Sequence, residues 1–179
     1  MRVFLAYRFD ERQLNKIDAV KQRLADHAIK GRFTKKDNLH ITIHYLGEVE
    51  KERLSDIRSA VKTVKQKPFT IRADSIGSFE REQGSIFYLH VDPSKQLRSV
   101  YRQTAVELEK RGFGVPERSY RPHITLARKA KLERHGDFDI RPLSIHADKI
   151  YLMESKHVND QLVYEPVFSM ALANNDIEK

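Results

Sequence analysis

Cysteine is absent from the 179-residue sequence, which excludes disulfide bonds, thiolate catalysis and zinc sites built on cysteine. The sequence also lacks the run of roughly 18 apolar residues that a membrane helix needs. Its opening, MRVFLAYRFDE, becomes charged too early to act as a signal peptide. Glycine-rich phosphate loops, GxSxG elbows and protein-kinase motifs are missing as well. We therefore expect a cytoplasmic protein with no membrane partner.

Basic residues are in excess, with 33 lysines and arginines against 25 acidic residues and a formal net charge of +8. They gather in three segments, TKK (34–36), KTVKQK (62–67) and RKAKLERH (128–135). A surplus of this kind favours a polyanionic partner such as nucleic acid. A merely solubilising surface would give the same composition.

One pattern, His-Ile-Thr followed by an aliphatic residue, occurs twice, in NLHITIHYLG and in RPHITLAR. The two histidines, His40 and His123, are 83 positions apart, and the same offset aligns VFLAYRFD near the N-terminus with IFYLHVDP in the second half. A further echo, at an offset of 74, aligns PFTIRADSI with PLSIHADKI. Each half therefore predicts a strand, a helix, a loop, a His-Ile-Thr strand and one more strand.

Local signals mark the ends of several elements. Asp10 and Gln13 form a capping-box pattern that begins the first helix. Pro93 fits the first turn of the equivalent helix in the second half, and Gly112 fits its end. The stretch LVYEPVFSMAL predicts a last strand, in which Pro166 favours a sheet edge or a bulge.

No low-complexity linker separates the two halves of the sequence. We therefore expect one domain, 1–179, made of two similar lobes at about 1–80 and 84–155, with a C-terminal strand. A pseudo-two-fold relation between the lobes would bring equivalent strands face to face across a groove.

Alternate side chains of a strand share one face. In the first motif His40 and Thr42 would line the groove, and in the second motif His123 and Thr125 would do so. The groove floor would then hold two imidazoles and two hydroxyls. His44 continues the alternation and is expected at the groove edge or in solvent.

This set of side chains suits chemistry at a phosphate. With an unperturbed pKa of roughly 6.5, one imidazole can take a proton from water while the other gives a proton to a leaving alkoxide. Threonine hydroxyls can donate hydrogen bonds to phosphate oxygens. Arg128 can neutralise phosphate charge if its strand ends or bulges near Ala127. A strained cyclic phosphodiester is already activated, so this chemistry requires no metal.

Neighbouring residues leave two questions open. A zinc site would need a third ligand besides the two histidines, for which the candidates are Asp37, His44 and Glu48. Base stacking or simple packing is available to Tyr120, Tyr45 and Phe4.

The paired motifs, together with the opening RVFLAYRFDE, resemble the 2H phosphoesterases, named after two His-x-Thr/Ser-x (HXTX) motifs. Within them the chain is most similar to the bacterial RNA 2′,3′-cyclic phosphodiesterases, also called 2′-5′ RNA ligase-like or LigT-like. The resemblance covers nearly the whole chain. It implies an α+β fold of two pseudo-symmetric lobes, with antiparallel sheets lining a central cleft and helices outside.

The same resemblance implies a monomeric hydrolase that needs no cofactor. Its substrate would be RNA with a 2′,3′-cyclic phosphate end, its product a 2′-phosphate, and the reverse reaction would form a 2′-5′ linkage. His40 would be the proton donor and His123 the proton acceptor. Thr42 and Thr125 would hold the phosphate.

Two other functions remain compatible with these residues. The same chemistry would also serve a small cyclic phosphate, such as a cyclic nucleotide or an ADP-ribose cyclic phosphate. A non-catalytic module that binds RNA ends is the other alternative, although binding alone does not require a proton donor and a proton acceptor.

Overall fold

The computed structural model describes residues 1–116, 119–134 and 138–173. Within these residues no helix is long and apolar enough to cross a membrane. The main elements in chain order are β1 (Arg2–Tyr7), α1 (Glu11–Asp26), β2 (Ala28–Phe33), β3 (Ile41–Glu48), α2 (Leu54–Lys62), β4 (Phe69–Phe79), β5 (Ser85–Val91), α3 (Lys95–Lys110), β6 (His123–Leu132), β7 (Leu143–Ala147), β8 (Lys149–Val158) and β9 (Gln161–Ala171).

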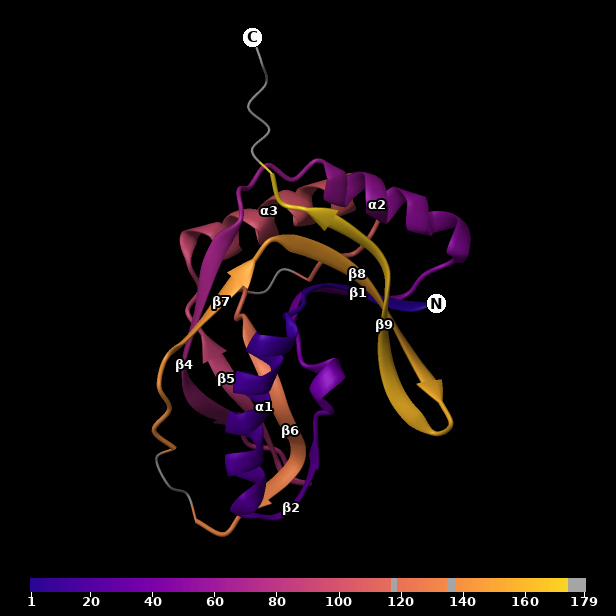
Figure 1. The fold of residues 1–179 in the computed structure, drawn as a ribbon. Coiled ribbons are helices and arrows are strands. Elements are labelled where there is room, and N and C mark those ends of the chain that lie inside the picture. The colour runs from indigo at the N-terminus through magenta and orange to yellow at the C-terminus, as the bar shows by residue number, and fades with distance from the viewer. Residues whose placement is uncertain (117–118, 135–137, 174–179) are drawn as a thin grey trace.

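The strands form two antiparallel sheets. One has four strands in the order β3-β1-β8-β9, and the other has five in the order β2-β6-β5-β4-β7. Helix α1 packs beside β2 of the five-stranded sheet, whereas α2 and α3 pack together and contact β9 and β3 of the four-stranded sheet (Figure 1). The predicted α+β fold, with antiparallel sheets and helices on their outer sides, is confirmed.

The internal repeat appears in the structure as an exchange of strands. β4 pairs with β7 in a register that places Ile71 opposite Ile145, the two positions that the 74-residue offset equates. The pseudo-two-fold axis therefore passes through this pair. On either side of the axis, β4 continues into the sheet of β5, while β8, which follows β7, joins β1. Each sheet thus contains strands from both halves, so the segments 1–80 and 84–155 are units of the sequence repeat and not of the sheets.

The element ends follow the sequence signals closely. The amide of Gln13 donates to the Asp10 carboxylate at 2.7 Å, and the Asp10 amide donates to Gln13 Oε1 at 3.1 Å, which confirms the capping box. In α3 the N-cap is Ser94, so Pro93 precedes the helix instead of lying in its first turn. Gly112 follows the last turn with a φ of 76°, as expected of a helix stop.

Two of the strands, β9 and β2, are edge strands of their sheets. Pro166 lies in β9, an edge strand, at a shift in its register with β8, so the predicted last strand has both features that proline favours. β2 is not predicted by the sequence, because its side chains are mostly exposed and show no alternation of apolar and polar residues. It pairs with β6 and forms an edge of the five-stranded sheet.

Candidate active site

The two motif histidines have the same local geometry. Nδ1 of His40 lies 2.7 Å from the carbonyl oxygen of Asn38, and Nδ1 of His123 lies 2.9 Å from that of Arg121. A carbonyl oxygen only accepts hydrogen bonds, so Nδ1 must carry the proton in each ring. The neutral imidazoles therefore share one tautomer, in which Nε2 is unprotonated and able to accept a proton.

A β-bulge follows the first motif. Ala6 pairs with Thr42 and Leu5 pairs with His44, so Ile43 is the extra residue on β3. Ile43 and His44 are consequently both buried, and the next residue, at position 45, returns to the exposed side. The prediction that His44 lies at the groove edge or in solvent is therefore wrong, because the bulge reverses the alternation.

His44 instead forms part of the core behind the groove and is only 4% exposed. Its Nε2 lies 3.0 Å from the carbonyl oxygen of Tyr101 and 2.8 Å from Thr104 Oγ1. Burial lowers the pKa of His44 from 6.5 to about 4, so the ring is neutral near pH 7. His44 is therefore a neutral hydrogen-bond donor that joins β3 to α3.

An equivalent bulge follows the second motif. Tyr88 pairs with Thr125 and Phe87 pairs with Ala127, so Leu126 is the extra residue on β6. Leu126 and Ala127 are both buried, and Arg128 is exposed. The bulge that Arg128 needs to face the groove is present at the predicted place.

Residues of the second motif affect the pKa of His40 in the first motif. Burial, opposed by the hydrogen bond to Asn38 and assisted by electrostatic interactions with His123 and Arg128, lowers the pKa of His40 from 6.5 to about 4. Both residues of the second motif are thus close enough to His40 to affect its ionisation. Its Nε2 lies 2.9 Å from Thr42 Oγ1, so the threonine hydroxyl donates to the unprotonated nitrogen.

Aromatic rings flank each histidine. The His40 ring has Phe4 at 4.9 Å and Tyr164 at 5.2 Å between centroids, while His123 has Tyr88 at 5.4 Å. Phe4 is a packing residue here, since it is 4% exposed and clusters with buried neighbours on β1 and β8. The sequence does not predict that Tyr164 or Tyr88 lies near a motif histidine. Their strands, β9 and β5, are distant in sequence from the histidines that they contact in space.

Each motif is also fixed by a side chain that precedes the other motif. Tyr120, three residues before His123, donates from its hydroxyl to the carbonyl oxygen of Thr42 at 3.0 Å. Thr34, six residues before His40, donates in the same way to the carbonyl oxygen of Thr125 at 2.9 Å. These two hydrogen bonds, the cross-motif bonds, connect the backbone of one motif to the segment leading into the other. They set the positions of the two strand ends relative to each other.

The candidate zinc ligands do not assemble. In the parts of the chain that the structure describes, no three histidine, cysteine or acidic side chains gather in a group able to hold a metal ion. The zinc alternative therefore gains no support from Asp37, His44 and Glu48.

A family model and curated relatives both show similarity of this chain to phosphoesterases. The family model described as LigT like Phosphoesterase matches residues 9–88. The chain is 25% identical over 176 residues to the RNA 2′,3′-cyclic phosphodiesterase of Thermotoga maritima, with 94% of each chain covered. It is 28% identical over 141 residues to the protein of the same name in Bacillus subtilis, with 75% of this chain and 76% of the relative covered.

A solved structure agrees with the fold. The crystal structure of Escherichia coli LigT complexed with 3′-AMP superposes with a TM-score of 0.77 at 25% identity, and the match covers 97% of this chain and 98% of that one. The two-sheet arrangement is therefore common to both molecules over nearly their whole length.

Proposed function

We propose that this chain, which belongs to the LigT-like 2H phosphoesterases, hydrolyses the 2′,3′-cyclic phosphodiester at the end of an RNA to a 2′-phosphomonoester. The observation that carries the proposal is the matched pair of imidazoles, His40 and His123, with one tautomer, equivalent strands and an electrostatic effect of His123 on His40. The names of the relatives support the substrate, and the net charge of +8 suits an RNA partner. Because both histidines come from one chain, we also propose that the single domain acts as a monomer.

In the proposed reaction His123 accepts a proton from water through Nε2 while the water oxygen attacks phosphorus. The bond from phosphorus to the 3′ oxygen breaks, and His40 gives its proton to that oxygen, so the phosphate remains on the 2′ position. Thr42 and Thr125 donate hydrogen bonds to the non-bridging oxygens, and Arg128 offsets their charge. Reversal of these steps would join RNA ends through a 2′-5′ linkage.

The donor role requires a proton on His40, whose pKa of about 4 leaves it neutral near pH 7 before substrate binds. A phosphodiester anion in the groove offsets the charge of Arg128 and favours the protonated form of His40, which raises the pKa of His40. It also competes for the hydroxyl of Thr42, which in the free protein donates to His40 Nε2. Substrate binding therefore prepares the donor, and the free protein holds it unprotonated.

The direct test is incubation with an oligoribonucleotide that ends in a 2′,3′-cyclic phosphate, in the presence of a chelator. We expect the oligomer to gain the mass of one water, and end-group analysis to find the phosphate on the 2′ oxygen. A 3′-phosphate product, a requirement for metal, or no conversion over hours would contradict the proposal. Tight binding without conversion would favour the non-catalytic alternative.

The cross-motif bonds give a second test of the site. Tyr120→Phe removes the hydroxyl but keeps the ring stacked on Tyr101, at 4.3 Å between centroids. We expect the free energy of unfolding to fall by about 1 kcal/mol. We also expect kcat to fall roughly tenfold, because small errors of placement are costly in catalysis. Steady-state kinetics and urea unfolding measure both effects.

Thr34→Val should have the same consequences from the other motif, and Tyr101→Phe is the matched control. The described part of the chain offers the Tyr101 hydroxyl no hydrogen bond, so this substitution keeps the stacked rings and both cross-motif bonds. If Tyr120→Phe changed kcat no more than Tyr101→Phe, the bond to Thr42 would have no positioning role.

A further inference from the structure

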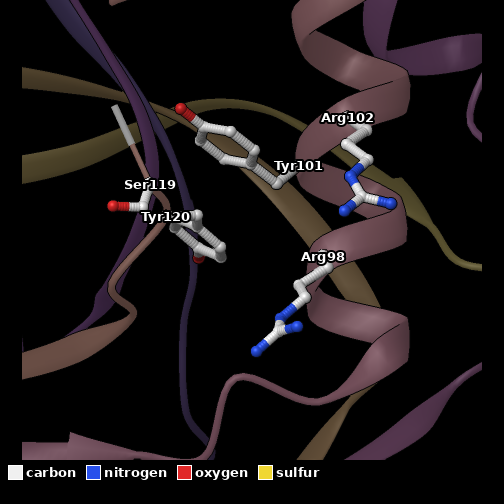
Figure 2. Close-up of a pocket in the computed structure, with 5 residues that line it drawn as sticks. All are labelled: Arg98, Tyr101, Arg102, Ser119 and Tyr120. Atoms are coloured by element: carbon white, nitrogen blue, oxygen red, sulfur yellow. The ribbon is translucent and has the colours of Figure 1, made fainter. Parts of the chain in front are cut away.

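A second pocket lies beside the site, on α3. It encloses about 380 Å³ and is lined by Arg98, Tyr101, Arg102, Ser119 and Tyr120. The Arg98 side chain extends from α3 towards Tyr120, and Arg102 lies one turn further along the same helix (Figure 2). No acidic side chain is among these described lining residues, so the pocket presents two guanidinium groups, a hydroxyl and two aromatic rings.

Helix stability does not explain Arg98 and Arg102, because like charges four residues apart on one helix are destabilising. α3 begins at Lys95, and its first turn contains no acidic residue, although a helix N-terminus favours negative charge. Helix α1, at the equivalent place in the repeat, follows the rule, with Asp10 as its N-cap and Glu11 in its first turn. The described residues provide neither Arg98 nor Arg102 with an ion pair. Ser94 caps α3 in place of an acidic residue, so the feature that favours a binding surface is the pair of like charges at Arg98 and Arg102.

The pocket shares one lining residue with a pocket that contains His123. Tyr120 lines it and also lines a neighbouring pocket of about 260 Å³ that includes His123 and Arg121. The Tyr120 ring stacks on Tyr101 at 4.3 Å and 13°, and its hydroxyl is bonded to the first motif. An RNA strand whose terminal cyclic phosphate lies at His123 can therefore pass along Tyr120 to reach α3.

We infer that Arg98 and Arg102 bind backbone phosphates of the nucleotides upstream of the cyclic end, which makes an oligoribonucleotide a better substrate than a cyclic mononucleotide. The inference rests on the proposed function. Arginine pairs with phosphate through two parallel hydrogen bonds, and Ser119 offers a further donor. Tyrosine rings suit the sugar and base faces of a single strand. The mononucleotide lacks the upstream phosphates and gains nothing from this pocket.

The experiment compares kcat/KM for a cyclic-ended oligomer with kcat/KM for the cyclic mononucleotide. In Arg98→Ala/Arg102→Ala we expect this ratio to fall about tenfold, through KM for the oligomer. The control, Arg12→Ala/Lys16→Ala, removes the same charge from two exposed positions one turn apart on α1 and should keep the wild-type ratio. An unchanged ratio in the α3 variant, or an equal loss on both substrates, would overturn the inference.

A binding assay separates failure of this inference from failure of the proposed function. The probe is a labelled RNA ending in a 2′-phosphate, the product, so that no turnover is needed. We expect its Kd to rise about tenfold in the α3 variant. The slope of log K against log salt should fall by about 1.4, from two lost contacts to a single strand. Arg98→Lys/Arg102→Lys keeps the charge and should retain most of that slope.

If the wild type hydrolyses neither substrate, the proposed function fails, but the binding assay still tests the pocket. A Kd for the RNA that changes no more in the α3 variant than in the α1 control would exclude the pocket as an RNA-binding site. Displacement of the RNA by inorganic phosphate at equal phosphate concentration would instead assign the pocket to free anions and also overturn the inference.

Discussion

Replacing either motif histidine by alanine should lower kcat for the cyclic phosphodiester by about 10³, within the range measured for general acid-base groups. His123→Ala removes the group that activates water, and His40→Ala removes the group that protonates the 3′ oxygen. Because the two proton transfers belong to one displacement, the double variant should lose little more than either single variant. The measurement is single-turnover hydrolysis of a cyclic-ended oligomer, with enzyme in excess so that product release does not contribute.

The control for this experiment is His146→Ala, which removes an exposed histidine from β7. It should retain full activity, and all variants should show the wild-type circular dichroism and a cooperative unfolding transition. Both motif histidines lie on the groove side of their strands, so their removal leaves the main core intact. Hydrolysis at the wild-type rate by either alanine variant would remove the acid-base pair from the mechanism.

Much of this site can be predicted from the sequence because its evidence is local. The motif positions, the apolar residues between them and the capping box at Asp10 all follow from short spacings, and the structure agrees with each. The duplication strengthens the prediction, because the same histidine and threonine occur in the same order in both copies. Arg128 could be predicted only conditionally, because its direction depends on a bulge.

Other features depend on contacts that no short window contains. His44 is assigned to the wrong face because a β-bulge leaves no mark in the residue alternation. The exchange of β4 and β8 between sheets depends on pairing around the pseudo-two-fold axis, which spacing does not specify. The contact of Tyr164 with His40 likewise joins segments far apart in the chain, and the pocket on α3 combines one side of a helix with residues beyond its end. The motif residues can therefore be predicted from local sequence patterns, whereas the residues around them depend on tertiary contacts.

Stability should fall steeply as the pH drops from about 6.5 to 4, because His40 and His44 are both held neutral by burial. In the folded protein each has a pKa of about 4, below its value of roughly 6.5 in the unfolded chain. Between these values the unfolded state binds more protons, so acid favours unfolding. For one histidine the loss at pH 4 reaches about 3 kcal/mol, and it levels off at lower pH once both states are protonated.

His44→Gln isolates one of these contributions. Glutamine can still donate a hydrogen bond to the Tyr101 carbonyl oxygen but does not titrate, so the variant should lose stability at neutral pH and show a shallower decline in acid. Urea unfolding at pH 7, 5.5 and 4.5 gives the difference in slope between wild type and variant, in which the shared contribution of the carboxylates cancels. Parallel curves would mean that His44 is protonated as readily in the folded state as in the unfolded state.

His40→Gln should reduce the dependence of stability on pH in the same sense. In the wild type a bound phosphate should partly restore stability in acid, because it favours the protonated form of His40 that the proposed donor role requires.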